Sequence, residues 1–216
     1  MIVHNLDKAN SVLNHFISEI RDLKIQKDAM RFRRNIERIG EILSYELSQE
    51  LHFKDHTVQT PLGEKKVPLV SDQLVLCSVL RAGLPLHQGI LNYFDQIENA
   101  FISAYRKHSS PEEFEIKVEY LASPSLDDKI LILADPMLAT GRSLAAVYEV
   151  LKKTGNIKQV HIVSVIAAEE GIDFISKHFP EDTHLWIATV DQNLNSKGYI
   201  VPGLGDAGDL AFGSKL

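Results

Sequence analysis

The stretch KILILADPMLATGRSLAAVYEVLKK, residues 129–153, decides the fold of this chain. It opens with Ile130–Ala134, a continuous apolar run that is typical of a strand buried on both faces. After the loop Asp135–Ser143, apolar residues recur at helical spacing as far as Lys153. The stretch therefore predicts a buried strand that leads, through a short loop, into an amphipathic helix.

Further apolar runs of strand length alternate with helical stretches along the chain. The other predicted strands are Leu74–Leu80, Ala100–Tyr105, Val160–Ala167 and Leu185–Val190, and the other helices between them are Pro85–Phe94 and Glu169–Phe179. Continuous rather than alternating hydrophobicity indicates parallel strands, so this order predicts an α/β fold, doubly wound, with a mainly parallel sheet flanked by helices.

The segments outside this alternation add to the sheet. Ser11–Leu23 has one apolar face, and a second helical stripe follows at Ile36, Ile39, Leu43 and Leu47. Both predict helices added before the sheet. The polar interval Lys107–Ser125 contains a strand-like run and predicts a β-hairpin flap.

Length, composition and charge narrow the class of protein. A chain of 216 residues with 44% hydrophobic and 24% charged residues is expected to form one soluble globular domain, residues 1–216. No apolar run approaches the ~18 residues of a membrane span, and the N-terminus lacks the features of a secretory leader. The single cysteine, Cys77, favours a cytoplasmic location. The net charge of −6 argues against a nucleic-acid partner.

The loop between the strand and the helix carries the groups of a sugar-phosphate site. In a doubly wound sheet, ligands bind beyond the carboxyl ends of the strands, where Asp135 stands. Thr140, Gly141 and Ser143 lead into a helix whose first N–H groups and positive dipole end favour phosphate. A carboxylate beside them can accept hydrogen bonds from ribose hydroxyls. The loop predicts a ribose-5-phosphate site, and the competing interpretation makes Asp135 and Ser143 only helix N-terminal caps.

A glycine-rich segment, GYIVPGLGDAGDLAFG at residues 198–213, is the second distinctive motif. It contains a literal G-x-G-x-x-G at residues 203–208. A dinucleotide-binding motif should follow a first strand and open a long helix, whereas only eight residues remain after Gly208. On composition alone, the segment is also compatible with a tail packed over the sheet edge.

Taken together, these motifs resemble those of one known family. LADPMLATGRS (residues 133–143) resembles the phosphoribosyl-pyrophosphate motif of type I phosphoribosyltransferases, in the form found in the uracil phosphoribosyltransferase family. Residues 198–213 are similar to that family's uracil-binding tail. VLRAGLP (79–85) and YRKH (105–108) resemble its two arginine loops, and TPLGEKK (60–66) and FRRNIERIGEILSYEL (32–47) resemble its hairpin and N-terminal helix. The resemblance covers nearly the whole chain.

The resemblance implies a type I phosphoribosyltransferase fold with a C-terminal base-binding hood. It implies a reaction of pyrimidine salvage, in which uracil and 5-phospho-α-D-ribose 1-diphosphate (PRPP) give UMP and diphosphate. The implied catalytic residues are Arg81, Arg106, Asp135 and Asp206. The implied PRPP-binding residues are those four with Pro136, Met137, Leu138, Ala139, Thr140, Gly141, Arg142 and Ser143. The implied uracil-binding residues are Ile200, Gly205, Asp206 and Ala207.

The resemblance also implies partners beyond the two substrates. Mg²⁺ is expected as a cofactor bound through the diphosphate of PRPP, with no metal ligands from the protein. GTP is expected as an effector, as in some relatives, and the chain is expected to form a homodimer or a larger homo-oligomer. No nucleic-acid or membrane partner is expected.

Three stretches depart from the family's pattern, and two alternatives stay open. Arg142 stands where relatives usually have glycine, Leu84–Gly89 differs from the usual run, and the segment after Arg106 lacks the usual acidic start. The alternatives are the same chemistry on another base and a nucleotide-responsive, RNA-binding regulator. None of the nine histidines falls in a zinc-binding pattern, and His108 and His161 are interpreted as surface and core-edge residues.

Overall fold

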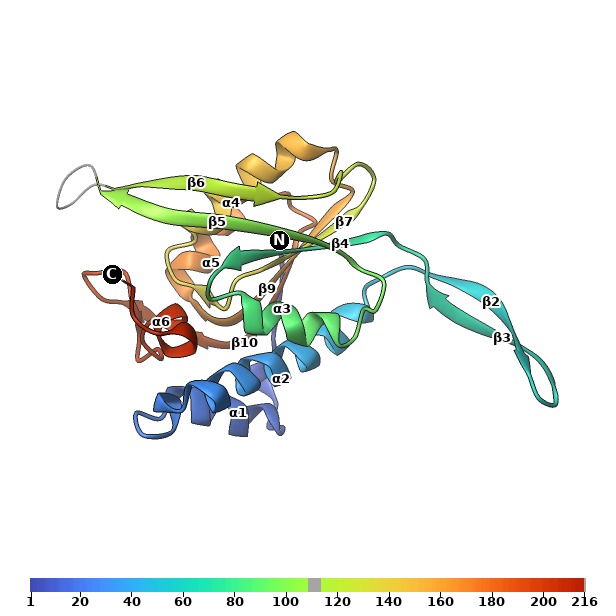
Figure 1. Cartoon of the computed structure of the whole chain (residues 1–216), viewed down its shortest axis with the longest axis horizontal. Helices are drawn as coiled ribbons and strands as arrows, with labels where there is room; N and C mark the ends of the chain where they lie inside the picture. The colour runs from blue at the N-terminus through green and yellow to red at the C-terminus, as the bar shows by residue number, and fades with distance from the viewer. Residues whose placement is uncertain (109–113, 216) are drawn as a thin grey trace.

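The protein is described by a computed structural model that covers residues 1–108 and 114–215. Within these ranges the strands of the main sheet lie in the order β1-β10-β9-β7-β4-β5-β6, and a short β8 pairs with β9 (Figure 1). Every pair is parallel except β5 with β6. Their bounds are β1 Ile2–Asn5, β4 Leu74–Leu80, β5 Glu98–His108, β6 Phe114–Ala122, β7 Ile130–Ala134, β8 Met137–Leu138, β9 Gln159–Ala168 and β10 His184–Asp191.

Helices cover both faces of the sheet, and each face has its own apolar core. On one face lie α1 (Leu13–Arg21), α2 (Ala29–Ser48) and α3 (Leu84–Leu91). On the other lie α4 (Arg142–Leu151) and α5 (Glu169–Ser176). The predicted stripe of α2 is confirmed, because its members are almost fully buried: Ile36, Ile39, Leu43 and Leu47. None of the helices within the described ranges is long and apolar enough to cross a membrane.

The remaining elements are short. The 3₁₀ helices are Leu6–Lys8, Ile25–Lys27 and Lys152–Thr154; strands β11 (Asn193–Leu194) and β12 (Ile200–Val201) form a small ribbon, and α6 spans Ala207–Phe212. The predicted mainly parallel α/β sheet, its N-terminal helices and its β5–β6 flap are confirmed. The tip of the flap, residues 109–113, lies outside the described residues.

Sequence patterns missed several short elements, among them β1 and α6. Strand β1 pairs in parallel with β10 at the sheet edge, Ile2 opposite His184. With only four residues, two of them polar, it shows no readable period. Helix α6 lies inside the glycine-rich tail, where Asp206 is its N-cap and accepts the N–H of Asp209 at 3.0 Å. Glycines on both sides of this one-and-a-half-turn helix hide it from propensity arguments.

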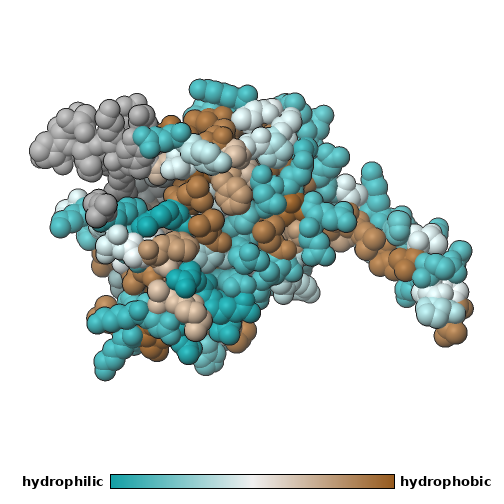
Figure 2. All heavy atoms as spheres, in the orientation of Figure 1, coloured by the Kyte–Doolittle hydropathy of each residue, from teal (hydrophilic) through white to brown (hydrophobic). Residues whose placement is uncertain are grey.

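A two-stranded arm projects from the body (Figure 1). It consists of β2 (Phe53–Thr60) and β3 (Gly63–Val70), which pair only with each other within the described part of the chain. This confirms the predicted hairpin. Its side chains are almost all exposed, and Figure 2 shows apolar atoms along it. At its base, Asp72 accepts the backbone N–H of His52 at 2.7 Å and the Nζ of Lys158 at 2.8 Å.

Candidate active site

Asp135 stands where the buried strand β7 ends, and its backbone is held on both sides. Its N–H donates to the carbonyl of Val163 at 3.1 Å, and its own carbonyl accepts the buried Ser164 hydroxyl at 2.6 Å. One carboxylate oxygen accepts the N–H of Met137 at 3.2 Å. Burial raises the pKa of Asp135 to about 6, with this hydrogen bond opposing the shift. The carboxyl is therefore fixed in place and ready to accept hydrogen bonds.

The loop after Asp135 forms a cradle at the N-terminus of α4. The N-cap of α4 is Gly141 (φ 74°), which has no side chain to offer, and neither Asp135 nor Ser143 caps this helix. The capping interpretation is therefore wrong. The N–H of Arg142 lies 3.5 Å from Thr140 Oγ1. A small cavity of about 50 Å³ opens here, lined by Asp135, Met137, Leu138, Ala139, Thr140, Gly141, Ser143 and Leu144.

This cradle can bind an anion because it lies at the N-terminus of α4, where Ala139, Thr140, Gly141 and Ser143 leave the backbone accessible. The first-turn N–H groups of a helix are free to bind an anion when no side chain caps them. Gly141 is required by space as well as by φ, since a Cβ there would lie 2.8 Å from Ile175 Cγ2 and 3.0 Å from the Gly171 carbonyl. Of the predicted PRPP-binding loop, Pro136 is buried and Arg142 is exposed, and both lie outside the cavity lining.

The loop after β4 carries Arg81 against the end of β7. A Cβ on Gly83 would lie 2.6 Å from the Val79 carbonyl and 3.2 Å from the Ala134 carbonyl, so the loop packs directly on the end of the strand that precedes Asp135. Arg81 Nη2 donates to the Gly213 carbonyl at 3.0 Å and lies 3.5 Å from Asp209 Oδ1. Its Nε is buried and has no hydrogen-bond partner among the described residues. A buried N–H of this kind is suited to a ligand oxygen.

A buried polar contact holds α3 beneath this loop. Ser78 Oγ, in β4, lies 2.8 Å from His87 Nδ1 in α3, and both residues are almost fully buried. The Asn99 side chain also hydrogen-bonds the imidazole, and the ring stacks on Phe101. Burial lowers the pKa of His87, so the ring is neutral at physiological pH. His87 belongs to the stretch that departs from the family's pattern, and sequence reasoning missed its role.

The C-terminal segment, residues 198–213, lies beside α1 and α2 (Figure 1) and is called the hood below. It contains all the predicted uracil-binding residues: Ile200 and Ala207 are buried, Gly205 is exposed with φ 94°, and Asp206 caps α6. The hood meets the Arg81 loop, since a Cβ on Gly208 would lie 3.9 Å from Ala82 Cβ. Met137 and Ala139 of the cradle pack on the same core as Ile200 and Ala207.

The structure thus brings the cradle, the Arg81 loop and the hood together at one end of the sheet. Arg106 lies in β5, next to β4, at the register position opposite Ile116; its side chain lies outside what the structure describes. Sequence reasoning missed Ser164, Asp209 and the pair Ser78–His87. The single hydroxyl within the apolar run of β9 was the available signal for Ser164, whereas the other contacts join distant residues and leave no local pattern.

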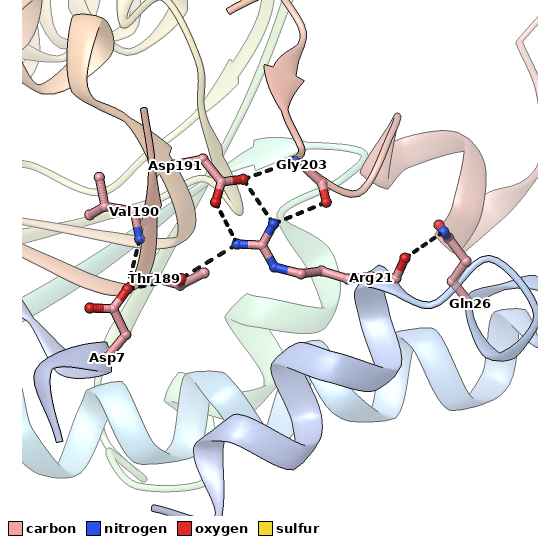
Figure 3. A network of polar contacts seen from close by, with 7 residues as sticks. All are labelled: Asp7, Arg21, Gln26, Thr189, Val190, Asp191 and Gly203. Atoms are coloured by element: carbon pink, nitrogen blue, oxygen red, sulfur yellow. Dashed lines mark hydrogen bonds and ion pairs between the residues drawn. The ribbon is translucent and has the colours of Figure 1, made fainter. Parts of the chain in front are cut away.

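Polar contacts also fix the hood to the body (Figure 3). Arg21 of α1 pairs with Asp191 at the end of β10, and both contact the backbone of Gly203. Among the described residues, no group of three or more His, Cys, Asp or Glu side chains is arranged to hold a metal ion.

Known proteins are similar to this chain in sequence. The chain matches the family model of uracil phosphoribosyltransferase over residues 8–214. It is 51% identical to the uracil phosphoribosyltransferase of Porphyromonas gingivalis over 216 residues, 100% of both chains. It is 39% identical to that of Pyrococcus furiosus over 203 residues, 93% of this chain and 85% of the other.

Solved structures of other proteins are similar to this chain in fold. The AQ2163 protein from Aquifex aeolicus has a TM-score of 0.88 and 30% identity over 100% of both chains. A hypoxanthine phosphoribosyltransferase from Staphylococcus aureus has a TM-score of 0.53 at 15% identity, over 86% of this chain and 83% of that one, and shows the type I phosphoribosyltransferase fold alone. With the fold and the motifs in agreement, this chain belongs to the uracil phosphoribosyltransferase family.

Proposed function

We propose that the protein transfers the phosphoribosyl group of PRPP to N1 of uracil, giving UMP and diphosphate. The bond between C1′ and the diphosphate oxygen breaks, a bond between C1′ and N1 forms, and the N1 proton passes to solvent. Family membership supports the reaction. The observation that carries it is the contact between the Arg81 loop and both other parts of the site: the end of β7 before Asp135 and the hood.

Each part of the site has a role in this proposal. The Asp135 carboxylate accepts hydrogen bonds from the ribose hydroxyls, and the N-terminus of α4, whose N-cap Gly141 offers no side chain, binds the 5′-phosphate. Arg81 and Arg106 bind the diphosphate, whose negative charge grows as the C1′–O bond loosens. The orphan Nε of Arg81 supports this role. Backbone groups at Gly205 and Ala207 bind the edge of the uracil ring, and Asp206 lies between them.

Uracil N1 must approach C1′ opposite the departing oxygen. Holding both substrates in this geometry supplies much of the rate, because a bound pair avoids the entropy cost of a bimolecular encounter. The shared core beneath Met137, Ala139, Ile200 and Ala207 supports a fixed spacing between cradle and hood. The protein therefore acts mainly by positioning.

Mg²⁺ is proposed as the cofactor, bound through the diphosphate. The donor set fits this mode: the carboxylates of Asp135 and Asp206 are hard oxygen donors that can hydrogen-bond the waters of Mg²⁺, but two such groups are too few for a protein cage. When bound, the ion neutralises charge on the diphosphate. Removing Mg²⁺ with a chelator is expected to abolish turnover.

A homo-oligomer, a GTP effector and a cytoplasmic location complete the proposal. The exposed β2–β3 arm supports assembly with a second copy, because Leu62, Leu69 and Val58 offer apolar surface to solvent. The reduced, buried Cys77 supports a reducing compartment. The GTP effector rests on the family resemblance alone, and activity measured with and without GTP tests it.

The direct test is product formation. The full chain is incubated with uracil, PRPP and Mg²⁺, and the products are resolved by chromatography. UMP and diphosphate should appear in equal amounts, and omission of PRPP should abolish both. Absence of UMP under these conditions would overturn the proposal.

A further inference from the structure

The backbone of the hood turn that precedes Gly205 borders an open cavity, although Leu204 within this turn is buried in the core. A cavity of about 550 Å³ separates it from the connection between α1 and α2, and its lining includes Leu23, Gln26 and Lys27 on one side and Pro202, Gly203 and Gly205 on the other. Helix α6 has further anchors, since Ala207 and Ala211 are buried. The polar backbone groups of Gly203, which lines the cavity, need hydrogen-bond partners of their own.

Arg21 and Asp191 form a polar clamp on this turn (Figure 3). The two guanidinium nitrogens Nη1 and Nη2 of Arg21 each lie 2.8 Å from one oxygen of Asp191, a bidentate pair. Arg21 Nη1 also donates to the Gly203 carbonyl at 3.1 Å, and Asp191 Oδ2 accepts the Gly203 N–H at 2.8 Å. Both backbone polar groups of one hood residue are thus held by one ion pair.

The clamp is fixed to the body at several points. Arg21 Nη2 reaches Thr189 Oγ1 at 3.4 Å, and that hydroxyl donates to Asp7 at 2.9 Å. Gln26 Nε2 donates to the Arg21 carbonyl at 3.2 Å. Only 22% of the Arg21 side chain and 8% of the Asp191 side chain are exposed. Burial alone would raise the pKa of Asp191, but the hydrogen bonds from Arg21 and the Gly203 N–H hold it below its usual value.

Gly203 itself can take no other residue. A Cβ there would lie 2.1 Å from the Ile200 carbonyl, and its φ is 60°. The turn is therefore tight. Because Gly203 lies two residues before Gly205, a displacement of Gly203 also displaces the backbone groups of Gly205–Ala207.

We infer that Arg21 and Asp191 are positioning residues for the base-binding part of the hood. The inference rests on the proposed function and extends it: the pair sets where the backbone of Gly205 and Ala207 meets the base, and its contacts among the described residues are with Thr189, Gln26 and Gly203, away from the PRPP cradle. Loss of the clamp should weaken the use of uracil and spare the binding of PRPP. A misplacement of about 1 Å can reduce a rate about a hundredfold.

The chain offers a matched control for a merely structural role. Asp72 has a side chain only 3% exposed, pairs with the cation of Lys158 and accepts a backbone N–H, that of His52. It lies at the base of the arm, just before β4. Asp72→Asn removes a comparable buried carboxylate far from the hood.

The test compares Asp191→Asn, Arg21→Lys and Asp72→Asn with the wild type. KM for uracil, KM for PRPP and the melting temperature are measured for each full-length protein. Asp191→Asn should raise KM for uracil by about ten- to a hundredfold and change KM for PRPP by less than about twofold. Asp72→Asn should lower the melting temperature without changing either KM. Arg21→Lys keeps the positive charge but cannot form the bidentate pair with Asp191. The variant should therefore fold and still show a raised KM for uracil.

The outcomes are separable. If the wild type forms no UMP, the proposed function falls and the inference falls with it. If the wild type is active and either clamp variant keeps a normal KM for uracil, the inference alone is overturned. An equal rise in both KM values would also overturn it, since that is the result of general distortion.

Discussion

At the scale of single residues, Asp135 combines a functional position with an energetic penalty. Its folded-state pKa of about 6 lies above the ordinary aspartate value of 3.8, so the carboxyl favours the folded state at low pH and loses this contribution as the pH rises through 6. At pH 8 the unliganded protein therefore holds a charge that the Met137 N–H compensates in part and that hydroxyl donors of a ligand would compensate further.

Asp135→Asn should separate these two effects. Losing a charge-assisted hydrogen bond of about 1.5–3 kcal/mol should lower kcat/KM for PRPP by roughly ten- to a hundredfold. The wild type should lose kcat/KM below pH 6, whereas the variant should lack that part of the acid limb; both are assayed in the same buffers, so the titration of PRPP cancels. The unliganded variant should also melt at a higher temperature at pH 8. An identical acid limb in both proteins would exclude Asp135 from the site.

His161 shows a residue whose environment the sequence misrepresented. It was expected at the edge of the core, but it is fully buried, accepts the Trp186 Nε1–H on Nδ1 at 3.1 Å and stacks on His184. Burial, then the neighbouring His184 and His4, lower its pKa to about 3. The strand period places the residue in a sheet, but it cannot show that His184 and Trp186 of the neighbouring strand β10 lie against its ring.

This burial predicts acid instability. The unfolded chain binds a proton at His161 near pH 6.5 and the folded chain near pH 3, so the free energy of unfolding should fall as the pH drops through this interval, by up to about 1.4 kcal/mol per pH unit. Urea unfolding at pH 7.5, 6.0 and 5.0 measures the slope. His161→Gln keeps an acceptor for Trp186 and cannot titrate, so its slope should be smaller. Equal slopes would contradict the assignment.

At the scale of elements, runs of apolar residues predicted the bounds of strands reliably where the strands are buried on both faces. The predicted bounds of β4 and β7 agree with the structure, and those of β9 and β10 differ by one residue at each end. The loops that form the site could be located because each follows such a strand. What could not be predicted is how the loops are supported, since Ser78–His87 and Arg21–Asp191 join residues from different elements.

The Ser78–His87 contact predicts a link between α3 and PRPP binding. Ser78→Ala leaves His87 Nδ1 buried without its partner, which should destabilise the protein by about 1–3 kcal/mol and raise KM for PRPP more than KM for uracil. Ser78→Ala with His87→Leu removes both polar groups, so stability should recover while KM for PRPP stays raised. Ser44→Ala is the control, because it removes an equally buried hydroxyl from α2. If both the stability and the KM for PRPP returned to wild-type values in the double variant, the contact would have only a structural role.

At the scale of the whole molecule, the arm is the feature that a single chain does not explain. It extends from the body with apolar side chains in solvent, and Leu62 at its turn is fully exposed. The sequence predicted this hairpin but not its isolation from the sheet. The assignment of residues 1–216 to one domain stays a prediction.

Assembly through the arm can be measured directly. Val58 and Leu69 lie on the same face of the hairpin, and replacing both with lysine should convert the oligomer to monomer in light scattering, because charged side chains resist burial. Gln59→Lys adds charge to the opposite face as a control and should leave the mass unchanged. An unaltered mass for the double variant would place the interface elsewhere.

The central claim is that the hood binds uracil by its hydrogen-bonding edge, and base discrimination tests it most directly. On this claim, a donor and an acceptor of the hood backbone should match uracil O4 and N3–H, whereas cytosine presents an amino group and a bare N3 and would leave both unpaired. The measurement is kcat/KM for uracil, 5-fluorouracil and cytosine with wild-type protein, Mg²⁺ and saturating PRPP. Uracil should exceed cytosine by on the order of 10⁴-fold, and 5-fluorouracil, which keeps the edge, should be used like uracil. Comparable turnover of cytosine and uracil would contradict the claim.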